Sequence, residues 1–200
     1  MHKHTEKENQ MDSQIKLSIL IPTIESRHEM LLDLVDRLLD QADELGVTNQ
    51  LEIIPLHGTE TIGEKRNMLL EMAEGRYICF FDDDDTPSDT YIRNVFEGIA
   101  MDKDCISLRG VITFDGENPS IFEHSIKYTA YKETDNDVRY ERYPNHLNAI
   151  KSDIAKQFKF PSSNFGEDKA WADLIFESGL IRSEHFVNEV IYHYNFIANK

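Results

Sequence analysis

The residues whose type and spacing most directly suggest chemistry are four consecutive aspartates, Asp82, Asp83, Asp84 and Asp85. They follow residues 77–81, an apolar, β-prone segment typical of a strand covered on both faces. Four adjacent like charges repel one another, so a solvated acidic turn is the purely structural alternative. Function is favoured by position, because ligands of open α/β sheets bind outside the carboxyl ends of strands and carboxylates suit hard divalent cations. We therefore expect a metal site at this turn.

A second acidic pair, Glu167 and Asp168, stands at the predicted start of a helix that runs to Gly179. A carboxylate there could act as a general base and take a proton from a reacting hydroxyl group. The structural alternative is a helix cap, since the helix dipole stabilises negative charge at this end. Trp171 lies on the same predicted helical face as Asp168, where it lines a ligand pocket or belongs to the core.

The elements that must position these residues alternate in type over the first half of the chain. Aliphatic and β-branched runs at residues 15–23 and 51–58 predict two strands before the strand at 77–81. Helical patterns at residues 26–46 and 61–75 separate the three strands. This alternation is typical of a parallel α/β sheet.

The first predicted helix carries its own start and stop signals. Ser26 and Glu29 form a capping-box pattern, and Gly46 supplies the end. The buried stripe that we expect for this helix consists of apolar residues at helical spacing, namely Met30, Leu34, Leu38 and Leu45.

The second half of the chain is less regular. We expect a helix at residues 88–101, a strand at residues 105–114 and a hairpin-like excursion within residues 121–143. A short helix, the helix that begins at Glu167 and a final strand follow, at residues 151–158, 167–179 and 186–196. No repeat or break in composition divides the chain, so residues 15–200 form one predicted domain after a flexible polar tail at residues 1–14.

The bulk composition is that of a folded protein of 200 residues, with 40% hydrophobic content. A formal net charge of -16 disfavours binding to a nucleic-acid backbone, which needs a basic surface. Cys79 and Cys105 lie far apart in apolar contexts, as is typical of reduced core residues. The N-terminus is polar and no apolar run is long enough to cross a bilayer, so the sequence predicts a cytoplasmic protein without a membrane span.

Three segments of this chain resemble motifs of family 2 glycosyltransferases. "LSILIPTIES" is similar to the family's first strand and its Pro-Thr-aromatic-Asn-Glu turn. "IGEKRNMLLEMAEGRYICFFDDDD" resembles a Gly-x-x-x-Arg-Asn helix, a strand and an Asp-x-Asp-Asp end, and "FGEDKAWADLI" resembles a late Glu-Asp helix start. These matches occur in the family's order over residues 17–194, which makes the set far more specific than any one motif.

The resemblance implies a GT-A fold: an α/β, Rossmann-like domain with a mixed, mostly parallel central sheet flanked by helices. It implies transfer of one sugar from a nucleoside-diphosphate sugar to an acceptor hydroxyl, with inversion at the anomeric carbon. We expect the donor to be a UDP-sugar. Residues 15–86 would form the nucleotide-binding half and residues 87–200 the acceptor-binding half. Mn²⁺ or Mg²⁺ would neutralise the charge that develops on the diphosphate leaving group. The acceptor and the oligomeric state stay open.

By this resemblance, Asp84 is the direct metal ligand and Asp83 lies near the ribose or the metal. Asp82 would orient the loop, and Asp85 would turn to solvent or cap the next turn. Arg66 is expected at the diphosphate, because its planar guanidinium matches phosphate oxygens; Lys65 is a weaker candidate.

Four further residues are expected beside the nucleoside. Pro22, Thr23 and Glu25 end the first strand, and His57 stands where the family usually has an aspartate that reads the base. This departure leaves the specificity for uracil open, with a loop-packing role as the alternative for His57.

The late residues complete the expected site. Asp168 is the candidate general base, with Glu167 beside it, and Trp171 would bind the sugar or acceptor. His193, in the last strand, would approach the metal or diphosphate, although a lone strand histidine is more often structural.

Two other functions remain possible at this level. A nucleotidyltransferase of sugar nucleotides would need a glycine-rich, basic phosphate loop after the first strand, which "IPTIESRHE" lacks. A non-catalytic sugar-nucleotide-binding module would not need both acidic clusters, and this chain keeps both.

Overall fold

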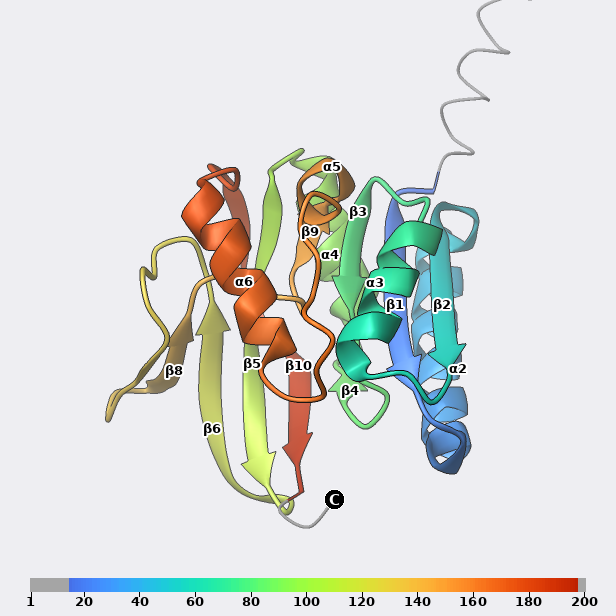
Figure 1. The fold of residues 1–200 in the computed structure, drawn as a ribbon, viewed down its shortest axis with the longest axis horizontal. Coiled ribbons are helices and arrows are strands. Elements are labelled where there is room, and N and C mark those ends of the chain that lie inside the picture. The colour runs from blue at the N-terminus through green and yellow to red at the C-terminus, as the bar shows by residue number, and fades with distance from the viewer. Residues whose placement is uncertain (1–14, 198–200) are drawn as a thin grey trace, which may run out of the picture.

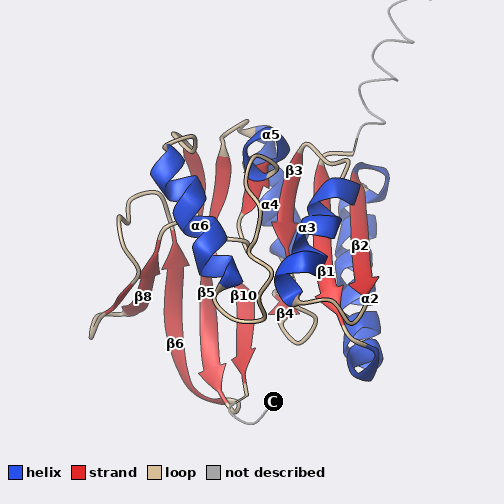
Figure 2. Ribbon diagram, viewed as in Figure 1, coloured by secondary structure: helices blue, strands red, loops and turns tan. Residues whose placement is uncertain are grey.

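The computed structural model describes residues 15–197, which form a mixed ten-stranded sheet with helices on both faces (Figure 1). The main strand order is β2-β1-β3-β9-β5-β6-β8-β7, and β10 runs beside β5 and β4. Helices α3 and α6 cover the face toward the viewer, and α2 and α4 cover the other face (Figure 2). The predicted tail, residues 1–14, lies outside the described residues.

The first half has the predicted strand–helix alternation. The strands β1 (Leu17–Thr23), β2 (Leu51–His57) and β3 (Tyr77–Phe80) are parallel neighbours, connected through α2 (His28–Leu45) and α3 (Ile62–Met72). Because parallel strands end at one edge of a sheet, the residues that follow β1 and β3 meet there.

The second half extends the sheet with antiparallel and parallel strands, so the sheet is mixed, as the fold class predicted. β5 is antiparallel to β6, whereas β10 runs parallel to β5. The remaining element bounds are η1 Glu25–Arg27, η2 Thr48–Gln50, β4 Thr86–Pro87, α4 Tyr91–Ala100, β5 Cys105–Phe114, β6 Glu117–His124, β7 Lys132–Glu133, β8 Val138–Arg142, β9 Ala149–Lys151, α5 Ser152–Ala155, α6 Glu167–Ser178 and β10 Glu184–Phe196.

A short strand that the sequence pattern did not predict joins the two halves. β9 lies between β3 and β5 and is antiparallel to both. The chain that enters β9 therefore passes beside the carboxyl end of β3. This path brings residues 145–148 next to the aspartate turn.

The core lies on both faces of the sheet. Leu34 and Leu38 of α2 belong to the cluster behind the sheet, and Leu69 of α3 and Trp171 of α6 belong to the cluster in front. Cys79 and Cys105 are buried free cysteines, as predicted. Within residues 15–197, no helix is long and apolar enough to cross a membrane.

The start of α2 differs from the prediction. A 3-10 turn precedes it, and no side chain caps it, so the predicted capping box of Ser26 and Glu29 is wrong. Met30 and Leu45, which were expected in the buried stripe, are exposed. Gly46 does end the helix in a left-handed conformation, with φ of 71°. The buried residues of α2 follow helical spacing and are Leu31, Leu34, Leu38 and Ala42.

Gly63 lets the first turn of α3 contact the loop that leads to α6. Its N–H donates to the carbonyl of Ser163 at 3.0 Å, and a Cβ atom there would lie 1.9 Å from the carbonyl oxygen of Pro161. We expect Gly63→Ala to lower the free energy of unfolding by about 1–3 kcal/mol through overpacking, as measured in urea. Met68→Ala, at an exposed position of the same helix, should change it by less than about 0.5 kcal/mol. An unchanged stability of Gly63→Ala would show that this loop does not pack on α3.

Candidate active site

The aspartate turn begins directly after β3, and each of its carboxylates has different partners. Asp83 is buried and accepts hydrogen bonds from the Thr23 hydroxyl at 2.6 Å and from Arg27 Nη1 at 2.7 Å. Arg27 Nη2 also lies 3.2 Å from Asp84 Oδ2. Burial lowers the pKa of Arg27, but the adjacent Asp84 and Asp83 carboxylates raise it by more, so the guanidinium is firmly charged. The ends of β1 and β3 are thus tied together by a salt-bridged arginine.

Asp85 points into the protein, which corrects the expectation that it turns to solvent. Its side chain accepts hydrogen bonds from the Tyr192 hydroxyl at 2.7 Å and from the backbone N–H of Asn195 at 2.8 Å. Burial and the nearby Asp82 raise the pKa of this carboxyl well above its usual value. The reason for the correction is that β10, remote in sequence, covers the turn. Asp85 anchors the turn to that strand.

Arg66 connects the aspartate turn to the start of α6. A capping box of Thr61 and Glu64 fixes the start of α3, so the arginine points inward from the second turn. Its Nη2 lies 3.0 Å from Asp82 Oδ1, and its Nε lies 3.5 Å from Glu167 Oε1. Its Nη1 is buried and has no hydrogen-bond partner among the described residues. That N–H is available to an anionic ligand.

Aromatic rings and a lysine complete the surroundings of Arg66. Its guanidinium carbon lies 5.1 Å from the ring centroid of Phe80 and 5.6 Å from that of Phe160. Lys65 is buried beside it and donates from Nζ to the carbonyl of Thr23 at 2.6 Å. Burial lowers the pKa of this lysine.

The start of α6 places two carboxylates differently. Gly166 is the N-cap in a left-handed conformation, with φ of 74°, and no side chain caps the helix. Glu167 is buried against Arg66, whereas the side chain of Asp168 is 31% exposed. Asp168 therefore does not make a capping hydrogen bond, and its carboxylate can contact a ligand.

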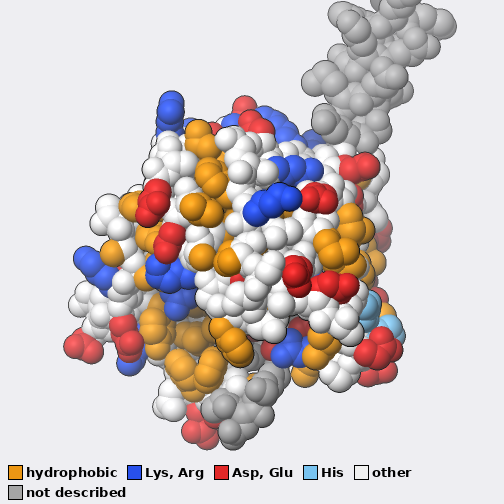
Figure 3. All heavy atoms as spheres, in the orientation of Figure 1, with side chains coloured by type: hydrophobic (Ala, Val, Ile, Leu, Met, Phe, Trp, Pro, Cys, Tyr) orange, Lys and Arg blue, Asp and Glu red, His pale blue; other side chains and the backbone are white. Residues whose placement is uncertain are grey.

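These groups line one cavity of about 620 Å³, a volume suited to a small-molecule ligand. Hydrophobic side chains gather over the lower ends of β5 and β6 in the space-filling view (Figure 3). Among the described residues, the charged lining consists of Arg27, Lys65, Arg66, Asp82, Asp83, Asp84, Asp85, Arg142, Glu167 and Asp168. Six carboxylates and four cationic side chains therefore line the same cavity, so its charge is mixed and not uniformly acidic.

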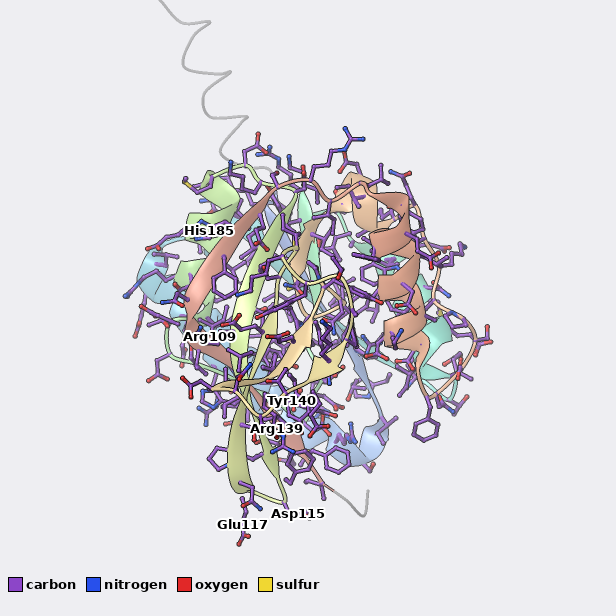
Figure 4. The ribbon with its side chains drawn as sticks, turned by 90° about the vertical axis from the view of Figure 1, so that its left-hand side faces the viewer. Arg109, Asp115, Glu117, Arg139, Tyr140 and His185 are labelled. Atoms are coloured by element: carbon purple, nitrogen blue, oxygen red, sulfur yellow. The ribbon has the colours of Figure 1, made fainter. Side chains whose placement is uncertain are left out.

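The side of the cavity formed by the later strands was not predicted. Tyr140 and Arg142 of β8 line it. Figure 4 labels Tyr140, which lies on β8 near the end of the strand order. The Arg142 guanidinium carbon lies 5.2 Å from the ring centroid of Tyr131. Buried His124 bonds through Nδ1 to Asn148 Oδ1 at 3.2 Å. Burial, followed by the charge of Arg142, lowers the pKa of His124 well below its usual value.

Most predicted donor-site residues lie in the cavity, but two do not. Pro22 and Thr23 line it, whereas Glu25 and His57 are outside its lining. His57 neighbours Thr23 in the β1–β2 register, and its Nδ1 lies 3.8 Å from Glu25 Oε2. Their roles beside a nucleoside stay predictions.

Two residues expected at a ligand, Trp171 and His193, are not part of the cavity lining. Trp171 is buried, stacks on Phe160 with ring centroids 4.7 Å apart, and donates from Nε1 to the carbonyl of Phe158. It belongs to the core because its side of α6 faces the sheet. His193 pairs with Thr86 in the β10–β4 ladder and does not line the cavity.

The residues present fit a metal that is shared with a ligand. Within residues 15–197, no group of three or more His, Cys, Asp or Glu side chains could hold a metal ion alone. Asp84 supplies a carboxylate at the cavity wall, and its side chain is 15% exposed. Mg²⁺ typically binds one or two carboxylates together with substrate phosphates and water. Asp84 therefore suits a cation that a diphosphate helps to hold.

The family of the chain follows from a comparison with known proteins. The sequence model "Glycosyl transferase family 2" matches residues 35–163, which is more than half of the chain. This match does not include Thr23, Arg27, Glu167 or Asp168. Their positions in the cavity are therefore known from the structure alone. No curated protein matches the chain.

Solved structures show the same fold. The crystal structure of S. aureus TarS 1–349 has a TM-score of 0.63 at 16% identity, over 90% of this chain and 60% of that chain. The complex of the same fragment with UDP-GlcNAc gives 0.63 at 14% identity, over 93% and 60% of the two chains. The UDP complex gives 0.63 at 15% identity, over 90% and 60%. This chain thus spans about 60% of the length of these structures.

The fold and the cavity define an α/β protein of the GT-A type, with a polar site at the carboxyl edge of a mostly parallel sheet. The chain belongs to glycosyltransferase family 2.

Proposed function

We propose that this protein transfers one sugar from a nucleoside-diphosphate sugar, specifically a UDP-sugar, to an acceptor hydroxyl. The observation that carries the proposal is that one cavity joins the aspartate turn, a buried arginine with an available N–H, and the Asp168 carboxylate. Family membership supports sugar transfer, and the UDP-GlcNAc and UDP complexes of TarS support the choice of donor.

The donor lies across the ends of β1 and β3. Its nucleoside rests against Pro22 and Thr23, which line that end of the cavity. Its diphosphate meets Arg66 Nη1 and the cationic groups of Arg27 and Lys65. Charge-assisted hydrogen bonds of this kind are the strong ones in anion recognition. Mn²⁺ or Mg²⁺ on Asp84 supplies further neutralisation of the leaving diphosphate.

Asp168 acts on the acceptor. As the acceptor oxygen attacks the anomeric carbon, its proton passes to an Asp168 oxygen while the bond from that carbon to the diphosphate breaks. A single displacement of this kind inverts the configuration at carbon. Glu167 is buried on Arg66, so it holds the arginine in place and is not the base.

The test of donor binding is calorimetry with UDP and Mn²⁺. We expect the wild-type protein to bind the nucleotide much more tightly with Mn²⁺ than without it. In Asp84→Ala this metal dependence should be lost, because the carboxylate that shares the cation with the diphosphate is gone.

Asp135→Ala is the matched control, since Asp135 is exposed and lies outside the cavity lining. It should bind as the wild type does. Metal-dependent binding that survives in Asp84→Ala would remove Asp84 from the metal site.

A further inference from the structure

His146 lies between the two acidic groups of the cavity. Its Nε2 is 3.6 Å from Asp82 Oδ2, and its Nδ1 is 3.7 Å from Asp168 Oδ2. Its side chain is 7% exposed, and neither ring nitrogen has a hydrogen-bond partner among the described residues. Buried polar atoms without partners are rare in folded proteins and call for an explanation.

The backbone around His146 is held firmly. Its carbonyl accepts the N–H of Phe80 at 2.8 Å, so the residue is tied to the last position of β3. Asn145 Oδ1 accepts the N–H of Leu147 at 3.0 Å, and Asn148 Oδ1 accepts the N–H of Asn145 at 3.0 Å. The ring is therefore presented to the cavity by a rigid turn.

The Asp168 carboxylate lies beside this ring. Within residues 15–197, His146 is the only side chain in ion-pair contact with the Asp168 carboxylate. Asp82, on the other side of the ring, is already fixed by Arg66. Both separations are just beyond hydrogen-bond length, and catalytic hydrogen bonds are often long without substrate and shorten when it binds.

We propose that His146 is the positioning residue for the catalytic base. Its Nδ1–H donates to one oxygen of Asp168, so the other oxygen is turned to the acceptor hydroxyl. Its Nε2 side lies toward Asp82, so the ring stands between the base and the aspartate turn. This inference rests on the proposed function, and His146 itself touches neither substrate.

A double-mutant cycle tests the coupling. His146→Ala should lower kcat about 10- to 100-fold, the loss expected for a misplaced catalytic group, and change the donor KM by less than about threefold. In the Asp168→Asn background the same change should lower kcat by less than about threefold, because the group it positions is already disabled. If His146→Ala lowers kcat as much in the Asp168→Asn background as in the wild type, the proposal is overturned.

Two conservative variants separate positioning from packing. The amide nitrogen of His146→Asn can lie near the place of Nδ1, whereas that of His146→Gln reaches the place of Nε2. The asparagine variant should therefore keep at least about tenfold more turnover than the glutamine variant, with similar melting temperatures. Equal turnover in the two variants would contradict the assignment of Nδ1 to Asp168.

A measurement without turnover keeps this inference distinct from the proposed function. In ¹⁵N spectra of the imidazole, Asp168→Asn should shift the Nδ1 signal of His146 more than the Nε2 signal. A protein that turns over no donor would reject the proposed function. An Nδ1 signal that does not respond to Asp168→Asn would overturn the positioning role, with or without turnover.

Discussion

Asp168→Asn should lower kcat by about 10²- to 10⁴-fold, the usual contribution of a positioned general base. Asparagine keeps the size of the side chain but cannot accept the acceptor proton. Because the base acts mainly in the transition state, the Kd of the donor with metal should change by less than about threefold. Steady-state kinetics and calorimetry measure the two quantities separately.

The fold should not respond to this substitution. Gly166 is the N-cap of α6 and no side chain caps the helix, so asparagine at position 168 removes no capping bond. Glu177→Gln, an exposed position on the same helix, is the control for loss of one negative charge. Near-native turnover of Asp168→Asn would exclude the residue as the base, and a joint loss of donor binding and melting temperature would make it structural.

Arg66→Ala should lower the free energy of unfolding by about 3–5 kcal/mol, the range for breaking a buried ion pair by removing one partner. The substitution leaves Asp82 and buried Glu167 without their common cation. Arg37→Ala is the control, because Arg37 forms an exposed pair with Asp33 on α2 and should contribute at most about 1 kcal/mol. Denaturant unfolding of both variants gives the comparison, and equal small losses would contradict the account of the buried pair.

The same substitution also tests the diphosphate contact under conditions where the variant is folded. Arg66→Ala should weaken nucleoside diphosphate binding more than nucleoside binding, by roughly 1.5–3 kcal/mol for a hydrogen bond to a charged group. Calorimetry with UDP and uridine measures the difference. An equal loss for both ligands would assign Arg66 to the fold alone.

The sequence predicted the part of the site that follows from strand order. Parallel strands end at one edge, so the pattern of residues 15–86 is enough to bring Thr23, Arg66 and the aspartates together. The Glu-Asp pair was found because the helix start at Glu167 is a local signal. The wider assignment of residues 15–86 to the nucleotide and 87–200 to the acceptor stays a prediction.

The rest depends on contacts between residues remote in sequence. His146 became visible only with β9, a three-residue strand too short to leave a periodic signal. Arg27 directly follows the first-strand motif but was not part of the predicted site. Its place in the site is evident only from its contacts with Asp83 and Asp84. Trp171 was misplaced because helical spacing cannot tell a core face from a cavity wall. His193 was expected at the metal or diphosphate because the sequence predicts the last strand but not which side of the sheet each of its side chains faces.

The most direct test of the account is release of free nucleoside diphosphate from a panel of nucleotide sugars, with Mn²⁺ and purified protein. We predict slow release from a UDP-sugar even without an acceptor, as water takes the acceptor's place, and no release by Asp84→Ala. Turnover of a nucleoside triphosphate with a sugar phosphate would instead show a nucleotidyltransferase. Tight binding of nucleotide sugars with no release under any of these conditions would show a non-catalytic module and contradict the proposed function.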